Sequence, residues 1–437
     1  MRLELRTSVM ERFDWPWIEA QVAQTSAVWE ACAAWRPVDG RQYCEAEQVE
    51  REKAYDAALE EVEREAKKKP RTRADRLQAQ ERMTDSFARF SATALDLPED
   101  AVLLLRNDFL PVGTALARWA RRFDESLSMA DIIQASRNAW TACGLQPLLG
   151  EKIALTPSIL GYSLMYPYSD NFLDSEDVPG EEKRRFGERF RRRLEGEEVA
   201  AANGHEAALW ALVELVEGQY PRAKYAQVFE CMLAIHRAQQ GSIAQVGREV
   251  AASDAEVLRI SCAKGGSSVL ADACLARGEL REDESRFGFD WGVLLQLGDD
   301  LQDVREDLLR GSMTMFSRAA ASGRRLDGLA SQLLSFSDYV GTEMEGLPHG
   351  SAMLKDLLRM SWRSLIVGAV ADSHEFFSPE FVAEMERSSA FRFEFLRARR
   401  KRLASREGLY AVLFNAFLEA PENDDMNVLP MPVLAGV

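Results

Sequence analysis

The chain has 437 residues, of which 46% are hydrophobic and 28% charged, the balance of a folded globular protein with a large core and not of a disordered chain. Its formal charge of −16 argues against nucleic acid as a partner, because contacts with phosphate backbones need a basic surface. No apolar run approaches the roughly 18 to 20 residues that span a bilayer, and the first segment is too polar for a signal peptide. We therefore expect a cytoplasmic protein without a transmembrane segment.

The cysteines are scattered along the chain. They lack the paired short spacings of a zinc site or of a disulfide framework. We expect reduced thiols that lie mostly in the core, at Cys32, Cys44, Cys143, Cys231, Cys262 and Cys274.

Residues 1 to 97 are predicted to form an N-terminal helical extension. Within it, residues 42 to 95 carry apolar positions at helical spacing inside long charged runs that are interrupted at Pro70. This pattern predicts two exposed amphipathic helices joined by a basic loop. The basic run could contact a membrane, but neighbouring glutamates cancel much of its charge, which favours a solvated linker.

Residues 98 to 420 are predicted to form one large helical bundle. Ala, Leu, Glu and Arg are abundant, apolar residues recur at helical period, and we find no convincing strand, so the predicted class is all-α. The region divides into roughly ten helices around one core. Breaks are expected near residue 125 and at Pro147, Gly150, Gly180, Gly204, Pro221, Gly241, Gly278, Gly311, Gly346 and Ser378. Residues 421 to 437 contain three prolines and are predicted to be an irregular tail.

A first acidic cluster follows an apolar and aromatic segment. Asp174 and Asp177 follow Asp170 by 4 and 7 residues, steps that return to within roughly 40° of the starting direction on a helix. The three carboxylates are therefore expected on one helix face, where like charges repel. A solvated C-terminal face is the simplest explanation, but acids at a helix C-terminus oppose the macrodipole, which favours a bound cation.

A second acidic cluster continues the apolar run WGVLLQLG. Asp299, Asp303 and Asp307 again recur at a spacing of four residues, and Asp300 and Glu306 lie beside them. A surface helix would usually intersperse bases among such acids. The calcium loop of an EF-hand is excluded, because its sixth position requires Gly and this chain has Val304.

Two such clusters predict a shared metal site for an anionic substrate. Mg²⁺ accepts carboxylate oxygens on one side and phosphate oxygens on the other. Metal ions held in this way neutralise the charge that builds on a departing diphosphate. The carbocation that remains needs a dry pocket lined by apolar and aromatic groups.

A lysine between the clusters is a candidate phosphate ligand. Lys264 precedes Gly265 and Gly266 inside an apolar helical segment, and two glycines within a helix cost roughly 1 kcal/mol each relative to Ala. Two explanations are equally open. The glycines either permit close helix packing or break the helix so that backbone and ammonium reach phosphate oxygens. Arginines after the first cluster, Arg185 among them, could add phosphate contacts, although most of them are expected on the surface.

These motifs resemble those of class I isoprenoid synthases, which comprise trans-prenyl diphosphate synthases, squalene and phytoene synthases and terpene cyclases. DNFLD at 170 to 174 is similar to the first Asp-rich motif, DDxxD, with Asn171 in place of the second Asp. DDLQD at 299 to 303 resembles the second motif of prenyl synthases, and DVRED at 303 to 307 that of squalene and phytoene synthases. The spacing from Asp299 also matches the metal triad of cyclases. KGGSS at 264 to 268 is similar to the Lys-containing helix break of prenyl synthases.

The resemblance covers about residues 100 to 320 and implies a fold and a site. The implied fold is a bundle of the isoprenoid synthase type with a central cavity. The implied cofactor is Mg²⁺, in more than one copy, with Mn²⁺ as an alternative. The implied metal ligands are Asp170, Asp174, Asp177, Asp299, Asp300, Asp303 and Asp307, with Asp170, Asp174, Asp299 and Asp303 carrying catalysis and Lys264, Arg185 and Arg305 binding the diphosphate.

One departure from the family selects among its reactions. We find no GKxxRP-like element before Asp170, the feature with which head-to-tail prenyl synthases bind a second substrate. This favours a terpene synthase that uses one prenyl diphosphate, in a monomer or a homodimer. A head-to-tail or head-to-head prenyltransferase is the nearest alternative, and a non-catalytic helical binding protein is a third. Tyr162, Tyr166 and Tyr168 of the first motif would line the cavity or fill the core.

Overall fold

The computed structural model describes residues 12 to 32, 41 to 68, 71 to 175, 177 to 243 and 253 to 418. Over these ranges the regular elements are helices and there is no strand, which confirms the predicted all-α class. None of the described helices combines the length and the apolarity needed to cross a bilayer. The predicted tail, residues 421 to 437, lies outside the described residues.

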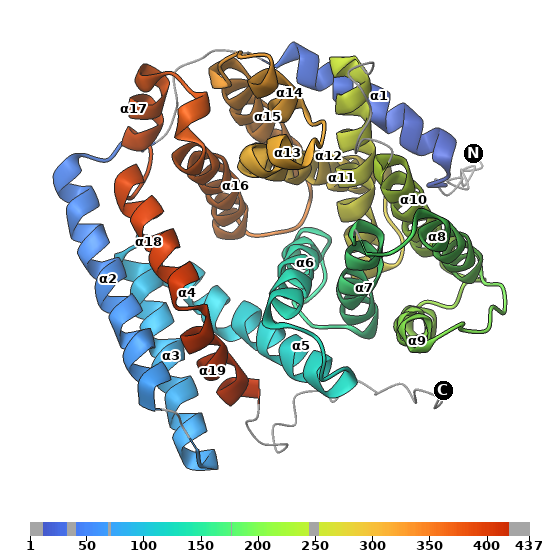
Figure 1. The fold of residues 1–437 in the computed structure, drawn as a ribbon, viewed down its shortest axis with the longest axis horizontal. Coiled ribbons are helices and arrows are strands. Elements are labelled where there is room, and N and C mark those ends of the chain that lie inside the picture. The colour runs from blue at the N-terminus through green and yellow to red at the C-terminus, as the bar shows by residue number, and fades with distance from the viewer. Residues whose placement is uncertain (1–11, 33–40, 69–70, 176, 244–252, 419–437) are drawn as a thin grey trace, which may run out of the picture.

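The first helix belongs to the main core. Helix α1 (Trp15–Ala31) begins after Asp14, whose carboxylate accepts a hydrogen bond from the Trp17 amide at 3.1 Å. It lies beside α11 and α15 (Figure 1), and its residues Ile18 and Trp29 are buried among theirs.

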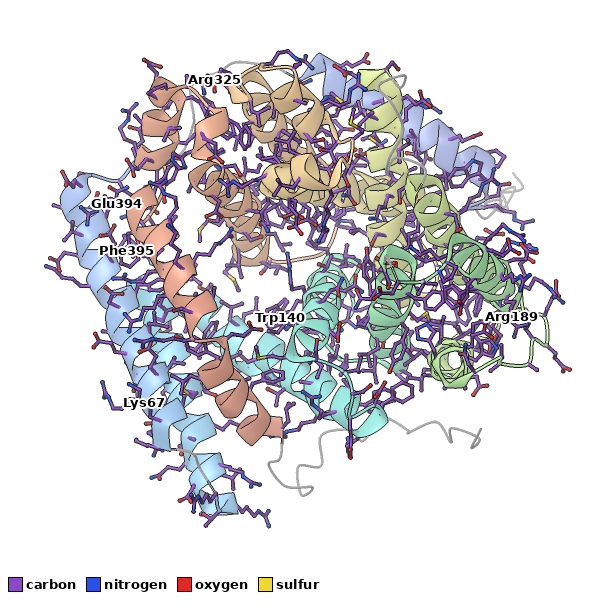
Figure 2. The ribbon with its side chains drawn as sticks, viewed as in Figure 1. Lys67, Trp140, Arg189, Arg325, Glu394 and Phe395 are labelled. Carbon is purple, nitrogen blue, oxygen red and sulfur yellow. The ribbon has the colours of Figure 1, made fainter. Side chains whose placement is uncertain are left out.

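The next two helices form the predicted pair. Helices α2 (Glu45–Lys68) and α3 (Arg73–Thr93) lie side by side (Figure 1), and the capping box of Thr72 and Asp75 begins α3 just after Pro70. The pair is less exposed than predicted, because it packs on two C-terminal helices. Figure 2 shows Phe395 beside α2, where its ring centroid is 5.5 Å from that of Tyr55.

Ion pairs between partly exposed arginines and buried glutamates reinforce this contact. Glu52 accepts hydrogen bonds from Arg392 at 2.6 Å, and Glu63 from Arg402 at 2.9 Å. The hydrogen bonds from Arg402 lower the pKa of Glu63 to about 2, against the opposing effect of burial.

The rest of the chain is divided more finely than predicted. Its elements are α4 (Glu99–Leu104), η1 (Leu105–Phe109), α5 (Leu110–Phe123), α6 (Met129–Leu148), α7 (Pro157–Asp174), α8 (Gly180–Leu194), α9 (Gly204–Gln219), α10 (Ala226–Ile243), α11 (Asp254–Arg277), α12 (Glu282–Gln302), α13 (Val304–Arg310), α14 (Met315–Ala321), α15 (Asp327–Gly346), α16 (Ala352–Asp372), η2 (His374–Phe376), α17 (Pro379–Arg387), α18 (Phe393–Ser405) and α19 (Glu407–Leu418). Helices α6, α7, α11 and α12 lie in the middle of the bundle (Figure 1).

Most predicted helix breaks are confirmed. Gly278 and Gly311 end helices with φ of 94° and 69°, a conformation that glycine adopts without a steric penalty. Gly204 and Gly180 each begin a helix. Near the break predicted at Gly241, α10 ends at Ile243, and the residues that follow lie outside the described part of the chain.

The contact between α11 and α12 depends on glycine. A Cβ on Gly292 would lie 2.1 Å from the carbonyl oxygen of Gly265, and a Cβ on Gly265 would lie 2.4 Å from Cβ of Gln296. Gly266 faces the ring of Phe289 in the same way, at 2.4 Å. Helix α11 runs unbroken through these glycines. The helix break considered at Gly265 and Gly266 is therefore wrong, and close packing is the correct explanation.

The cysteines are free thiols, as predicted. Cys143, Cys231, Cys262 and Cys274 are buried, so the expectation of mostly core positions is confirmed.

We predict that Gly292→Ala destabilises the protein by about 1 to 3 kcal/mol or more, because the added methyl group must push α11 and α12 apart. Gly218→Ala is the matched control, since a methyl group added to this helical glycine of α9 would meet no atom within 4 Å. The control should stabilise the protein by roughly 0.5 to 1 kcal/mol. Urea unfolding measures both changes. Equal effects of the two substitutions would contradict the packing argument.

A buried carboxyl pair joins α1, α12 and α15. Asp290 accepts a hydrogen bond from Thr25 and lies beside Glu343, which accepts from Arg286 at 2.7 Å. Tyr339 also donates to Glu343, at 2.9 Å. Burial and the neighbouring Glu343 raise the pKa of Asp290 above its usual range.

This raised pKa makes stability depend on pH. The unfolded chain releases the Asp290 proton at lower pH than the folded chain, so the contribution of this group is complete below about pH 4 and is lost as pH rises through the raised value. We predict that Asp290→Asn flattens the loss of stability between about pH 6 and pH 9. Urea unfolding at about pH 6 and at about pH 9 tests this, with Asp283→Asn at the exposed start of α12 as control. An unchanged pH dependence in Asp290→Asn would refute it.

Candidate active site

The first acidic cluster lies at the C-terminal end of α7. This helix begins with Pro157 after the Thr156 cap and buries its aliphatic face in the core. Asp170, in its last turn, is half-buried, and its Oδ1 accepts a hydrogen bond from Nε2 of Gln239 on α10 at 2.6 Å. The side chain of Gln239 on α10 therefore holds the Asp170 carboxylate in place.

The other residues of the first motif separate from Asp170. Helix α7 ends at Asp174, whose side chain lies outside the described part of the chain. Asp177 follows in an exposed turn, where its amide donates to Oγ of Ser175 at 3.3 Å. The prediction that all three aspartates share one helix face is wrong for Asp177, because the helix ends before it. Asn171 also points elsewhere and donates to Asp131 at 2.8 Å.

The second cluster spans a helix junction. Asp299 and Asp300 lie in the last turn of α12, Asp303 caps this helix, and Asp307 lies on α13. The acids are thus divided between two helices. Their spacing stays close to helical, however, because the Asp303 amide donates to the Asp299 carbonyl at 2.8 Å and the Asp307 amide to the Asp303 carbonyl at 2.9 Å.

Burial, which is complete at Asp300 and partial at Asp299 and Asp307, makes this cluster electrostatically costly, whereas Asp303 is exposed. It raises the pKa of Asp299 and Asp300 to about 6 and that of Asp307 to about 7, and it also raises the pKa of Asp303. Neighbouring carboxylates add to the shift at Asp299, Asp303 and Asp307. A cation would relieve both the desolvation and the repulsion.

Asp300 differs from its neighbours. It is only 6% exposed, and both of its oxygens accept hydrogen bonds, one from Ser261 at 2.9 Å and the other from Gln296 at 2.8 Å. These bonds fix Asp300 against α11. Of the acids in this cluster, Asp299 and Asp303 lie at or near the end of α12 and are the better candidates for metal ligation.

One tyrosine lies within the electrostatic range of both clusters. The negative charges of Asp170, Asp299 and Asp272 each raise the pKa of Tyr166, after the larger effect of its burial. Tyr162, one turn earlier on α7, is buried and donates to the Ser268 carbonyl of α11 at 3.4 Å.

Two cationic side chains act on the second cluster. The charge of Lys264 lowers the pKa of Asp299 and Asp300 against the effect of burial, so its ammonium lies within electrostatic range of the end of α12. Arg137 of α6 lowers the pKa of both Asp299 and Asp303. Sequence reasoning missed Arg137. Its signal was available, because it is the single basic residue between Met129 and Leu148.

The other predicted phosphate ligands are engaged elsewhere. Arg185 lies on the surface of α8 with its side chain 72% exposed and pairs with Glu181 at 2.9 Å. Arg305 is turned toward the end of α16, where it pairs with Glu375 and donates to the Asp372 carbonyl at 3.0 Å. Figure 2 shows Arg189 at the outer edge of the bundle, and it pairs with Glu206 at 2.8 Å. Nearby glutamates, which the motif comparison did not consider, hold these three arginines in ion pairs.

The carboxylate oxygens of the two clusters are of the type that Mg²⁺ binds. Carboxylate oxygens are its preferred protein ligands, and raised pKa values mark acids that lack a compensating cation. Among the described residues, no group of three or more His, Cys, Asp or Glu side chains is close enough to hold a metal ion. Each helix end thus offers separate carboxylates, and substrate phosphate oxygens would have to complete the coordination.

We predict that Asp299→Asn raises the free energy of unfolding at about pH 8 by about 1 to 3 kcal/mol without metal, because it removes a buried charge. The penalty of Asp299 is absent below about pH 4 and appears as pH rises through about 6, so the gain should shrink on acidification. Asp356→Asn, an exposed position on α16, is the control. Urea unfolding at about pH 8 and at about pH 4 measures the stability of both variants and of the wild type. Equal stability of wild type and Asp299→Asn at pH 8 would contradict the explanation by a buried charge.

Comparison of the chain with models of protein families, with curated proteins and with solved structures gave no match.

Proposed function

We propose that this chain is a class I terpene synthase, which ionises one prenyl diphosphate with Mg²⁺ between two acidic helix ends of an isoprenoid synthase-type bundle. One observation carries the proposal. Asp170 and Asp299, which are far apart in the sequence, lie within the electrostatic range of the same phenol, because both raise the pKa of Tyr166. Acidic helix ends near the same half-buried aromatic side chain suit a metal-bound diphosphate followed by a hydrocarbon chain.

The acidic and the basic side chains of the site would have different roles. Asp170, Asp299 and Asp303 would hold the metal, which when bound supplies positive charge that neutralises the departing diphosphate. Lys264 and Arg137 would donate hydrogen bonds to phosphate oxygens from the other helices of the site. Because burial raises the pKa of Tyr162 and Tyr166 far above neutrality, their rings stay uncharged. Such rings can stabilise a carbocation through their faces without reacting with it.

The direct test is turnover of defined substrates. Purified protein would be incubated with Mg²⁺ and prenyl diphosphates of several lengths, with and without isopentenyl diphosphate. We expect release of inorganic diphosphate from a single substrate and an organic product that contains no phosphate. A longer diphosphate formed only with isopentenyl diphosphate would instead identify a prenyltransferase. No release from any substrate, with the protein folded, would favour a non-catalytic binding protein.

We predict that Lys264→Ala slows diphosphate release about 10-fold to 100-fold, because it removes a charge-assisted contact worth roughly 1.5 to 3 kcal/mol. Lys53→Ala on the exposed face of α2 is the control and should leave the rate unchanged. Single-turnover rates with saturating substrate give the comparison. A Lys264→Ala rate equal to that of the control would remove Lys264 from the site.

A further inference from the structure

Basic residues are concentrated where α2 ends and α3 begins. Residues 64 to 76 include seven bases and two acids, a formal charge of +5 in a chain whose total is −16. These two helix ends lie at the outer edge of the molecule (Figure 1), and Figure 2 shows Lys67 on the outer side of α2. We call the exposed bases of the described part of this segment the basic tip, which consists of Arg64, Lys67, Lys68, Arg71 and Arg73.

The glutamates of α2 pair with bases elsewhere, contrary to the balance that their spacing along the chain suggests. Glu63 forms an ion pair with Arg402 of α18 at 2.9 Å, and its side chain is 5% exposed. Glu65 is 4% exposed and pairs with Arg82 of α3 at 2.8 Å. Of the basic tip, only Lys68 shares Glu65 with Arg82 among the described residues. The buried glutamates therefore serve the packing of the helices and leave the tip positive.

The exposed acids near the tip offset it only in part. Asp75 takes part in the capping box of α3, where its carboxylate accepts a hydrogen bond from the Thr72 amide at 3.1 Å. Within the part of the chain that the structure describes, Lys67, Arg71 and Arg73 form no ion pair. Holding three unpaired bases beside one another is unfavourable without an anionic partner.

We propose that the basic tip docks on an anionic phospholipid surface and so holds this protein reversibly at a membrane. A Lys or Arg next to such a surface strengthens binding roughly fivefold. Charges act over only about 8 Å at physiological ionic strength, so the acids in the rest of the bundle oppose the contact little. The inference goes beyond the proposed function and does not depend on it.

A lipid surface fits the tip better than a nucleic acid does. Residues 64 to 76 contain no aromatic side chain on which a base could stack. Leu77, four residues after Arg73 on α3, is 44% exposed. An apolar side chain beside basic ones suits the boundary between headgroups and acyl chains, where both kinds of contact contribute to binding.

Sedimentation of the full-length protein with lipid vesicles tests the proposal. One set of vesicles is phosphatidylcholine alone, and the other is an equal mixture with phosphatidylserine, both without Mg²⁺. We expect binding to the anionic vesicles only, and weaker binding at about 0.5 M than at about 0.05 M NaCl, because salt screens the charges. The variant Lys67→Ala/Arg71→Ala/Arg73→Ala should lose affinity about 100-fold.

A second triple variant controls for net charge. Arg184→Ala/Arg191→Ala/Arg192→Ala removes the same charge from α8, on the far side of the molecule in Figure 1, where these arginines pair with glutamates. This variant should change affinity less than about threefold. Circular dichroism checks that both variants are folded.

The outcomes also separate this inference from the proposed function. Equal binding to both kinds of vesicle, an equal loss in the two folded variants, or no binding at the lower salt would each overturn it. Tip-dependent binding of a short RNA that is tighter than binding to the anionic vesicles would overturn it as well and identify a nucleic-acid partner. Diphosphate release is measured without vesicles, so the terpene synthase proposal is tested separately.

Discussion

The close contact between α11 and α12 is the constraint on which the site depends. Gly265 and Gly292 let the two backbones approach until a methyl group on either one would collide with its neighbour. This approach sets Lys264, the residue before Gly265, near the last turn of α12, where its charge acts on Asp299 and Asp300. Packing and electrostatics are thus coupled, because the same glycines that join the helices place the cation beside the acids.

The acids at the end of α12 oppose folding. Asp299, Asp300 and Asp307 are held where burial raises their pKa. Lys264 compensates Asp299 and Asp300 in part, and Arg137 compensates Asp299 in part. Charged groups that are buried without full pairing are costly, and such arrangements concentrate at functional sites. A bound cation would convert this cost into affinity, which is why we interpret the cluster as a binding site and not as a solvated surface.

Helix α7 separates two environments. Tyr162, Tyr166 and Asp170 recur every four residues and face the candidate site, as helical geometry requires. Tyr168 and Asn171 face another side, where Tyr168 donates to Asp124 at 2.6 Å and Asn171 to Asp131. The substitution of Asn for the second Asp of the motif therefore falls outside the acidic cluster and leaves Asp170 unaffected.

The sequence by itself determined the helical class, the paired helices before residue 95, most helix boundaries and the two acidic clusters, because periodicity, caps and glycine or proline breaks are local. It did not determine the end of α7 before Asp177, the junction at Asp303 or the roles of Gly265 and Gly266. Those features depend on which helices pack together. Only the tertiary structure brought Arg137 to the acids, engaged Arg185 and Arg305 elsewhere and paired Glu63 and Glu65 with arginines of other helices, because contacts between distant residues leave no periodic signal in the chain.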